Sequence, residues 1–237
     1  MWRVINLFQW VLIFSSIIFS GILAILSLLI SKKLSFWVAK NIWSRSLCAF
    51  VFSKVSLFNK QRLQSIKNES VMYCANHQSM YDIPALFIAL DKPIHFIAKK
   101  ELKKIPFIGW YVTTAGMIFI DRTNREKAMR SMKKAGTLIK NGRNVITFPE
   151  GTRSSNGKLN LFKRGSFIIA KNSNIKIVPV AIKGTLEVNP PNSFKLRSNK
   201  IAVNFGTPIN PLDHPNLSPE QLASLTQKQV STLLEEV

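Results

Sequence analysis

The N-terminal part of the chain is dominated by one long apolar segment. Val4–Ile30 comprises 27 residues without a charged side chain and is rich in Ile, Leu, Phe and Val. As a helix it would extend ~40 Å, which exceeds the ~30 Å hydrocarbon core of a bilayer. The run is too long for a typical signal peptide, and no clear small-residue cleavage site follows it. The pattern therefore predicts a membrane-anchoring helix.

The next segment combines basic and aromatic residues. Lys33–Phe58 alternates lysine and arginine with phenylalanine and tryptophan, which is typical of a stretch that lies at the membrane interface. Arg3 and the Lys32-Lys33 pair flank the apolar run on both sides, so charge does not decide whether it spans the bilayer or folds back within one leaflet. We expect residues 1–60 to form an N-terminal unit of membrane-anchoring helices.

From about residue 66 the pattern changes to alternating strands and helices. Helices are predicted at Arg125–Lys140, which ends at Asn141-Gly142, at 163–172, and after the Ser218-Pro219 start signal. Short apolar runs predict strands at residues 71–75, 95–98, 116–120, 144–148, 175–182 and 200–205. Repeated strand–helix units indicate an α/β sheet covered by helices, which would occupy residues 61–237.

Composition narrows the classes of partner. The chain has 33 Lys plus Arg against 12 Asp plus Glu, a formal charge of +21, so it needs an anionic partner such as a membrane surface, a phosphorylated substrate or nucleic acid. Residues 1–68 hold nine basic groups and no acidic one, together with the apolar run, which favours a membrane. Two cysteines exclude a disulfide scaffold, and three scattered histidines give no indication of a metal site.

A first candidate site follows the strand predicted at 71–75. His77 and Asp82 lie five residues apart in the block Asn-His-Gln-Ser-Met-Tyr-Asp. If residues 79–87 are helical, Asp82 can turn back to the imidazole and fix its tautomer, leaving the other ring nitrogen as a base. Ser79 is not expected to be a nucleophile, because no glycine elbow surrounds it. By itself this spacing is also typical of a surface histidine beside a helix-start aspartate.

A second cluster follows the strand predicted at 144–148. In the block Phe-Pro-Glu-Gly-Thr-Arg-Ser, Gly151 allows close backbone approach and Arg153 offers a planar fork for a phosphate. Lys163 and Arg164 are near enough in sequence to reinforce that charge. Considered alone, the block is also typical of a charged loop that caps a sheet.

Two further blocks carry charges to the ends of predicted strands. The block Gly116 to Arg122 would deliver Asp121 and Arg122 to the sheet edge, and Lys99–Trp110 is basic and apolar. Individually they are typical of a strand-end ion pair and of a solvated face.

In their order along the chain, these blocks resemble the glycerolipid acyltransferase family, specifically bacterial 1-acyl-glycerol-3-phosphate acyltransferases. The resemblance covers residues 70–185, about half of the chain. The matching blocks are Asn76-His77 with Asp82 (NH-x4-D), Gly116 to Arg122 (G-x-x-F-I-D-R), Phe148 to Ser154 (F-P-E-G-T-R-S) and Val178-Pro179-Val180. The stretch Lys99–Trp110, which contains Lys100-Glu101-Leu102, departs little from a further sequence pattern of the family.

The resemblance implies an α/β fold with a mixed sheet covered by helices, and a reaction without a metal or other cofactor. His77 would deprotonate the free hydroxyl of lysophosphatidic acid, and Asp82 would orient the imidazole. The alkoxide would attack an acyl thioester directly, while backbone amides near the strand-to-helix turn would hold the oxyanion. The residues that the resemblance assigns to substrate binding are Glu150, Gly151, Thr152, Arg153, Arg122 and Lys100.

The same resemblance predicts partners and location. The donor would be acyl-CoA or acyl carrier protein, the product phosphatidic acid, and the surroundings anionic membrane lipids, with no nucleic acid. We expect the bacterial inner membrane, with the catalytic unit on the cytoplasmic side where acyl thioesters are made. Two alternatives stay open: an acyltransferase of the same fold that uses another lysophospholipid, and a non-enzymatic membrane-surface or nucleic-acid-binding protein that uses the charge of +21.

Overall fold

A mixed sheet forms the centre of the computed structural model, which describes residues 2–121 and 125–237. Its strands are β1 (Lys54–Phe58), β2 (Met72–Ala75), β3 (Ile94–Lys99), β4 (Ile118–Ile120), β5 (Asn144–Thr147), β6 (Ile177–Lys183) and β7 (Lys200–Phe205). Within the described residues they lie in the order β1-β7-β6-β2-β5-β3-β4. Neighbours are parallel except β6 and β7, which are antiparallel. The expected mixed α/β sheet is confirmed.

Strand β1 lies outside the strands that the sequence predicts. The sequence pattern assigns Lys54–Phe58 to the basic and aromatic interfacial segment, but the strand pairs in parallel with β7 at the edge of the sheet. Only Val55 in this strand is partly buried. An exposed edge strand lacks the apolar run that marks a central strand. The division of the chain at residue 60 stays a prediction.

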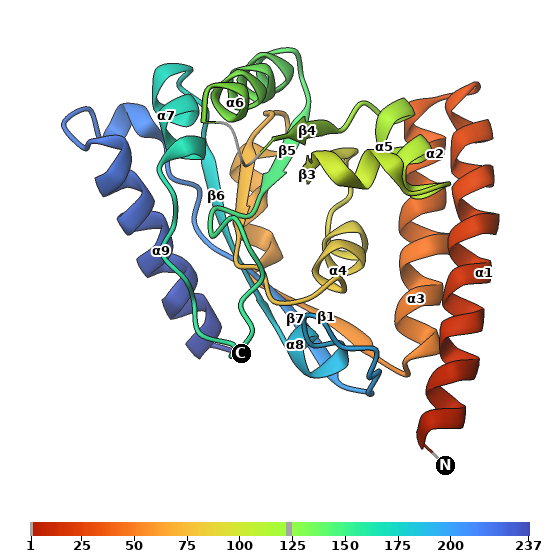
Figure 1. Cartoon of the computed structure of the whole chain (residues 1–237). Helices are drawn as coiled ribbons and strands as arrows, with labels where there is room; N and C mark the ends of the chain where they lie inside the picture. The colour runs from red at the N-terminus through yellow and green to blue at the C-terminus, as the bar shows by residue number, and fades with distance from the viewer. Residues whose placement is uncertain (1, 122–124) are drawn as a thin grey trace.

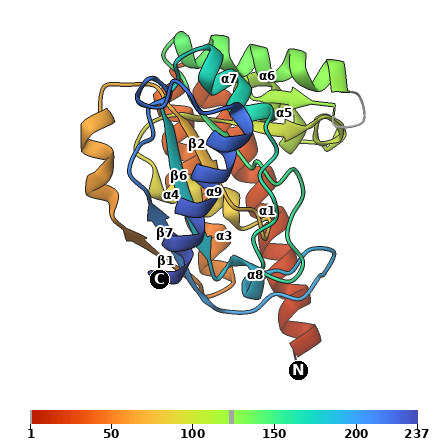
Figure 2. The same cartoon turned by 90° about the vertical axis from the view of Figure 1, so that its left-hand side faces the viewer.

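Three helices cover one face of the sheet, as Figures 1 and 2 show. They are α6 (Arg125–Lys140), α7 (Gly165–Asn172) and α9 (Pro219–Glu235). Ala135, Phe167 and Leu222 belong to the buried cluster beneath them. Ser218 is the N-cap of helix α9 and forms a capping box with Gln221, so the helix start predicted there is confirmed.

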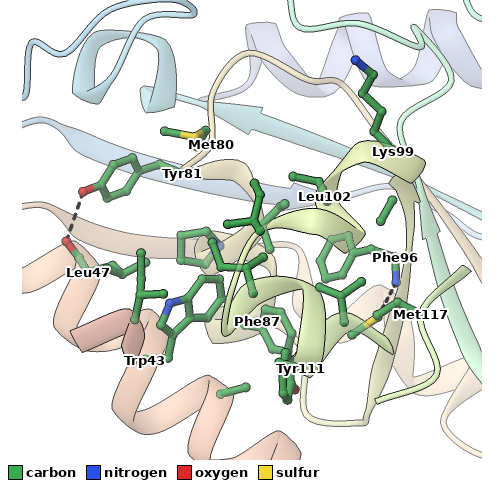
Figure 3. A pocket seen from close by; sticks show the side chains of 18 of the residues that line it. Trp43, Leu47, Met80, Tyr81, Phe87, Phe96, Lys99, Leu102, Tyr111 and Met117 are labelled. Carbon is green, nitrogen blue, oxygen red and sulfur yellow. Dashed lines mark hydrogen bonds between the residues drawn. The ribbon is translucent and has the colours of Figure 1, made fainter. Parts of the chain in front are cut away.

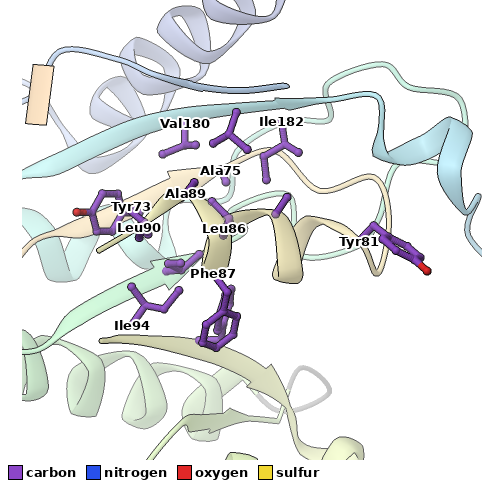
Figure 4. Close-up of a cluster of buried hydrophobic side chains, with 14 of the residues drawn as sticks. Tyr73, Ala75, Tyr81, Leu86, Phe87, Ala89, Leu90, Ile94, Val180 and Ile182 are labelled. Carbon is purple, nitrogen blue, oxygen red and sulfur yellow. The ribbon is translucent and has the colours of Figure 1, made fainter. Parts of the chain in front are cut away.

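The opposite face is covered by α4 (Asp82–Ala89) and by the N-terminal helices (Figure 1). These helices are α1 (Trp2–Leu28), α2 (Lys32–Val38), a π-helical segment (Ala39–Ser44) and α3 (Arg45–Phe50). Leu86 and Phe87 of α4 pack among Ile94, Val180 and Ile182 from the sheet (Figure 4). The cluster extends into α1–α3 through buried side chains that include Phe36 and Leu47. The N-terminal helices therefore share one hydrophobic core with the sheet.

Short helices and polar contacts complete the architecture. They are α5 (Ile108–Thr114), α8 (Thr185–Val188) and the 3₁₀ segments Lys60–Ile66, Lys100–Lys104 and Pro211–Asp213. Asn6 of α1 exchanges hydrogen bonds with the backbone of Leu196, and Trp10 Nε1 donates to the Phe194 carbonyl at 2.8 Å. These contacts attach α1 to the loop between α8 and β7.

Helix α1 is the part of the described chain that has the length and composition to cross a membrane. Arg3–Leu28 has a mean hydropathy of 2.5, and 22% of its most apolar 18-residue stretch is buried. The buried positions Gln9, Ile13, Ser20, Ala24 and Ser27 form one stripe along the helix, at spacings of three, four or seven residues. The opposite face consists of exposed apolar side chains: Val4, Leu7, Phe8, Val11, Phe14, Ile18, Phe19, Ile22 and Leu26.

Candidate active site

The sequence motifs meet at one edge of the sheet. The parallel strands β6, β2, β5, β3 and β4 are neighbours, so the loops that follow their C-terminal ends lie side by side. This edge is where α/β sheets usually place their functional loops.

His77 and Asp82 form a direct pair in the loop that leaves β2. The His77 Nδ1 atom lies 2.7 Å from Asp82 Oδ2, and Asp82 is fully buried at the first residue of α4. The short helix therefore returns the carboxylate to the imidazole, as the spacing predicts. With Nδ1 held by Asp82, His77 Nε2 is the ring nitrogen left to exchange a proton with a substrate.

The backbone amides of this loop are already engaged by carboxylates. Gln78 and Ser79 donate their backbone N–H groups to Asp82 Oδ2 at 2.7 and 2.9 Å, and His77 donates its own to Glu150 Oε1 at 2.7 Å. These bonds satisfy the buried Asp82 carboxylate and fix the turn. The expectation that amides at this turn hold the oxyanion is wrong for these three groups, because buried carboxylates use them instead.

Glu150 connects two loops from inside the protein. Its side chain is buried; Oε1 accepts from the His77 amide and Oε2 accepts from the Asn160 amide at 3.0 Å. Burial raises the pKa of the Glu150 carboxyl above its usual value, although the two backbone N–H groups and nearby His77 act in the opposite direction. The structure thus gives Glu150 a role in holding the His77 loop, and its assigned role in acceptor binding stays a prediction.

Other contacts make the loop rigid. The His77 ring stacks on Phe148 with a centroid distance of 4.0 Å and an interplanar angle of 15°, and the Ser154 amide donates to the His77 carbonyl at 2.8 Å. Asn76 exchanges two hydrogen bonds with the backbone of Ile182 in β6, at 2.7 and 2.8 Å. The first residue of the NH-x4-D motif therefore ties the loop to the neighbouring strand.

His77 lines a large apolar cavity of about 1000 Å³. Figure 3 shows Trp43, Leu47, Phe87, Phe96 and Tyr111 gathered around it. The walls come from α1, the π-helical segment, α3, α4, β3 and α5, so the N-terminal helices form one side. A cavity of this size and character is suited to an extended apolar chain.

The remaining predicted residues lie around the same edge. Thr152 and Arg153 line the cavity together with His77. Gly151 has φ +77°, a left-handed backbone conformation that favours glycine at this position.

The strand β4 and Asp121, from the block Gly116 to Arg122, lie at the far end of the same edge. Lys100 lies 3.5 Å from Asp121 in an ion pair that joins the ends of β3 and β4. Arg122 lies outside the described residues. Within the described ranges, no group of three or more His, Cys, Asp or Glu side chains has an arrangement that could hold a metal ion.

The sequence analysis missed Thr185. This residue follows the predicted strand at 175–182 and Gly184, and its hydroxyl donates to Asp82 Oδ1 at 2.5 Å. A polar residue just past the end of a buried strand was the available signal, because functional groups in α/β sheets concentrate there. The partner lies 103 residues away in sequence, and strand order alone brings the two together.

Comparisons with known proteins agree with this arrangement. The model of the family described as Acyltransferase matches residues 54–183. A 1-acyl-sn-glycerol-3-phosphate acyltransferase of Chlamydomonas reinhardtii is 29% identical, over 98% of this chain and 69% of its own length. One from Helicobacter pylori is 33% identical, over 70% of this chain and 71% of its own.

A solved structure extends the likeness to the whole fold. The crystal structure of the 1-acyl-sn-glycerophosphate (LPA) acyltransferase PlsC from Thermotoga maritima matches with a TM-score of 0.86 and 27% identity, covering 99% of this chain and 95% of that one. The likeness therefore includes the N-terminal helices as well as the sheet.

Proposed function

The chain belongs to the acyltransferase family, and on that basis we propose that it transfers an acyl group from a thioester to the free hydroxyl of lysophosphatidic acid, giving phosphatidic acid. The printed names of the relatives support this choice of acceptor. The observation that carries the proposal is the His77–Asp82 pair at the wall of the apolar cavity, which brings a base next to a site for acyl chains.

The pair supports direct acyl transfer. His77 Nε2 takes the proton of the acceptor hydroxyl as its oxygen attacks the thioester carbonyl carbon and forms the new C–O bond. The tetrahedral intermediate then expels the thiolate, the C–S bond breaks, and His77 returns the proton to sulfur. Asp82 keeps the imidazole oriented and stabilises its charged form, as aspartate does in other His–Asp pairs.

The functional test is turnover by the purified full-length protein in detergent, with a panel of acceptors and donors. Acylation of lysophosphatidic acid in preference to other lysophospholipids is the expected result. Preference for a different lysophospholipid would support the alternative acceptor, and absence of thioester turnover with every acceptor would exclude an acyltransferase. Acyl-CoA and acyl carrier protein are compared as donors in the same assay.

Arg153 is proposed to bind the acceptor phosphate, with Arg122 and Lys100 as further cations. Arg153 lines the cavity beside His77. A guanidinium presents a planar fork that matches two phosphate oxygens, whereas an ammonium acts as a point charge.

We expect Arg153→Ala to raise the KM for lysophosphatidic acid about 10- to 100-fold, because hydrogen bonds to charged groups contribute about 1.5–3 kcal/mol. Arg153→Lys should restore only part of the affinity. Arg164, which the sequence suggests could reinforce the charge at the phosphate, instead pairs with Glu220 of α9 at 2.6 Å, so Arg164→Ala is the matched control. Steady-state kinetics with each substrate varied in turn gives the KM for the acceptor and for the donor. A raised KM for the acyl donor alone would contradict the assignment of Arg153 to the acceptor phosphate.

The apolar cavity is proposed to hold the acyl chain that is transferred. Small residues of α1 leave room in its wall: Gly21 lies where an added Cβ would be 3.7 Å from Phe107 Cβ, and Ala24 lines the same region. Larger side chains here would shorten the space for an acyl chain.

Gly21→Leu is expected to lower kcat/KM for long-chain donors about tenfold relative to short-chain donors, because each buried methylene contributes ≈ 0.8 kcal/mol. Ser15→Leu, on the exposed side of α1, is the control. The measurement is kcat/KM across a series of saturated acyl-CoA donors. An unchanged chain-length profile in Gly21→Leu would show that this part of the cavity does not bind the acyl group.

Membrane association is proposed to occur through the exposed apolar face of α1. From Val4 to Leu26 the exposed side chains of this face are apolar except Ser15, and the chain carries a charge of +21 that suits anionic lipids. Phe52 and Phe194, both largely exposed, add apolar surface, and Phe194 contacts Trp10 of α1. We propose the inner membrane of a bacterium, with the catalytic edge facing the cytoplasm.

A further inference from the structure

The two oxygens of the Asp82 carboxylate have different partners. Oδ2 accepts from His77 Nδ1 and from the amides of Gln78 and Ser79. Oδ1 accepts from Thr185 Oγ1 at 2.5 Å, the one donor to this oxygen that the described part of the chain provides. Asp82 and Thr185 are both fully buried, so water cannot replace this hydroxyl without a change in the structure.

The fold places Thr185 with little freedom. Strand β6 pairs with β2, and the hydrogen bonds between Asn76 and Ile182 continue that pairing to the His77 loop. Gly184 then turns the chain with φ +89°, where a Cβ would lie 2.0 Å from the Lys200 carbonyl oxygen, so glycine is required. Thr185 follows as the first residue of α8 and is held against Asp82.

We propose that Thr185 is a positioning residue that fixes the Asp82 carboxylate against the His77 imidazole. The inference rests on the proposed function, because it assigns His77 as the base. The Thr185 hydroxyl draws negative charge toward Oδ1 and thereby weakens the attraction of Oδ2 for a protonated imidazole. Without it, the carboxylate also gains freedom to rotate away from the imidazole plane.

A changed pH profile distinguishes this positioning role from a purely structural one. His77 faces the Asp82 carboxylate, so a change in how that carboxylate is held alters the negative charge beside the imidazole. Other titratable or charged groups near His77 are left unchanged by substitution at 185. They are Glu150 beneath the loop and Tyr81, Lys99, Glu101 and Arg153 along the cavity.

The test is Thr185→Val, which keeps the β-branched shape and removes the hydroxyl. We expect kcat to fall about tenfold or more, with both KM values within about twofold, and the pH profile of kcat/KM to differ from that of the wild type. Thr185→Ser should recover most of the rate and the wild-type pH profile. Thr226→Val is the matched control: Thr226 is equally buried, but its hydroxyl donates to the Leu222 carbonyl within α9.

A second measurement separates this inference from the proposed function. Titration of ¹⁵N-histidine-labelled protein in detergent, with the His77 signals assigned from His77→Gln, follows the imidazole directly and without turnover. A His77 titration that differs between Thr185→Val and the wild type supports the inference even where lysophosphatidic acid is not the acceptor. An unchanged titration and wild-type kcat in a folded Thr185→Val would overturn it. If the valine variant does not fold, Thr185→Ser against Thr185→Ala gives the same comparison.

Discussion

His77→Ala is expected to lower kcat by about 10²–10⁴-fold, the usual contribution of a positioned general base. The prediction follows from the geometry, because Nδ1 is occupied by Asp82 at 2.7 Å and the ring lines the cavity. Binding of both substrates should change little, so the loss appears in kcat. The melting temperature of each variant in detergent checks that the loop around Phe148 remains folded.

Asp82→Asn isolates the effect of charge. An asparagine can keep its oxygen toward His77 and the two backbone amides and donate from its nitrogen to Thr185, whose hydroxyl also accepts. The network then survives while the negative charge is lost, and kcat should still fall by more than tenfold. His214→Ala, at a half-exposed histidine outside the site, is the control. A folded His77→Ala or Asp82→Asn protein with more than about a tenth of the wild-type rate would remove the catalytic assignment.

The sequence predicts the buried part of the sheet well and its periphery poorly. Strands β2, β5 and β6 are buried at nearly every position, so they appear as short continuous apolar runs. Strand β1 is mostly exposed and has no such pattern. Helix α5 was also missed, because it depends on tertiary contacts. It starts after Phe107, which has a positive φ of 60°, and Gly109 lies against the Lys103 carbonyl.

At the active site, too, the sequence predicts local contacts better than contacts between distant segments. Spacing within one loop is enough to predict the His77–Asp82 contact, because a helix start returns residue 82 toward residue 77. The contacts of His77 with Glu150 and of Asp82 with Thr185 cross 73 and 103 residues, and they depend on strand order. The engagement of the loop amides by carboxylates follows from the same order. Local spacing therefore reveals the reacting pair, whereas the groups that support it require the fold.

Helix α1 should respond in two different ways to substitutions on its two faces. Ile13 is 4% exposed and packs in the core that α1 shares with α4 and the sheet. Ile13→Ala should therefore lower the free energy of unfolding, by about 2 kcal/mol, the low end for buried Ile→Ala because Ile13 borders a cavity. Membrane binding should be unchanged. Thermal unfolding in detergent and flotation with anionic vesicles measure the two effects.

On the other face, Phe14 and Phe19 are 58% and 66% exposed. The double variant Phe14→Glu/Phe19→Glu should keep its melting temperature but bind vesicles at least 10³-fold more weakly, because a carboxylate at the centre of an inserted helix costs about 2.5–3.5 kcal/mol. High salt should not release the wild type, since basic groups contribute only ≈ 1 kcal/mol each near an anionic surface. Wild-type protein in a high-salt supernatant, or a double variant that floats with vesicles as the wild type does, would show that this face of α1 does not enter the bilayer.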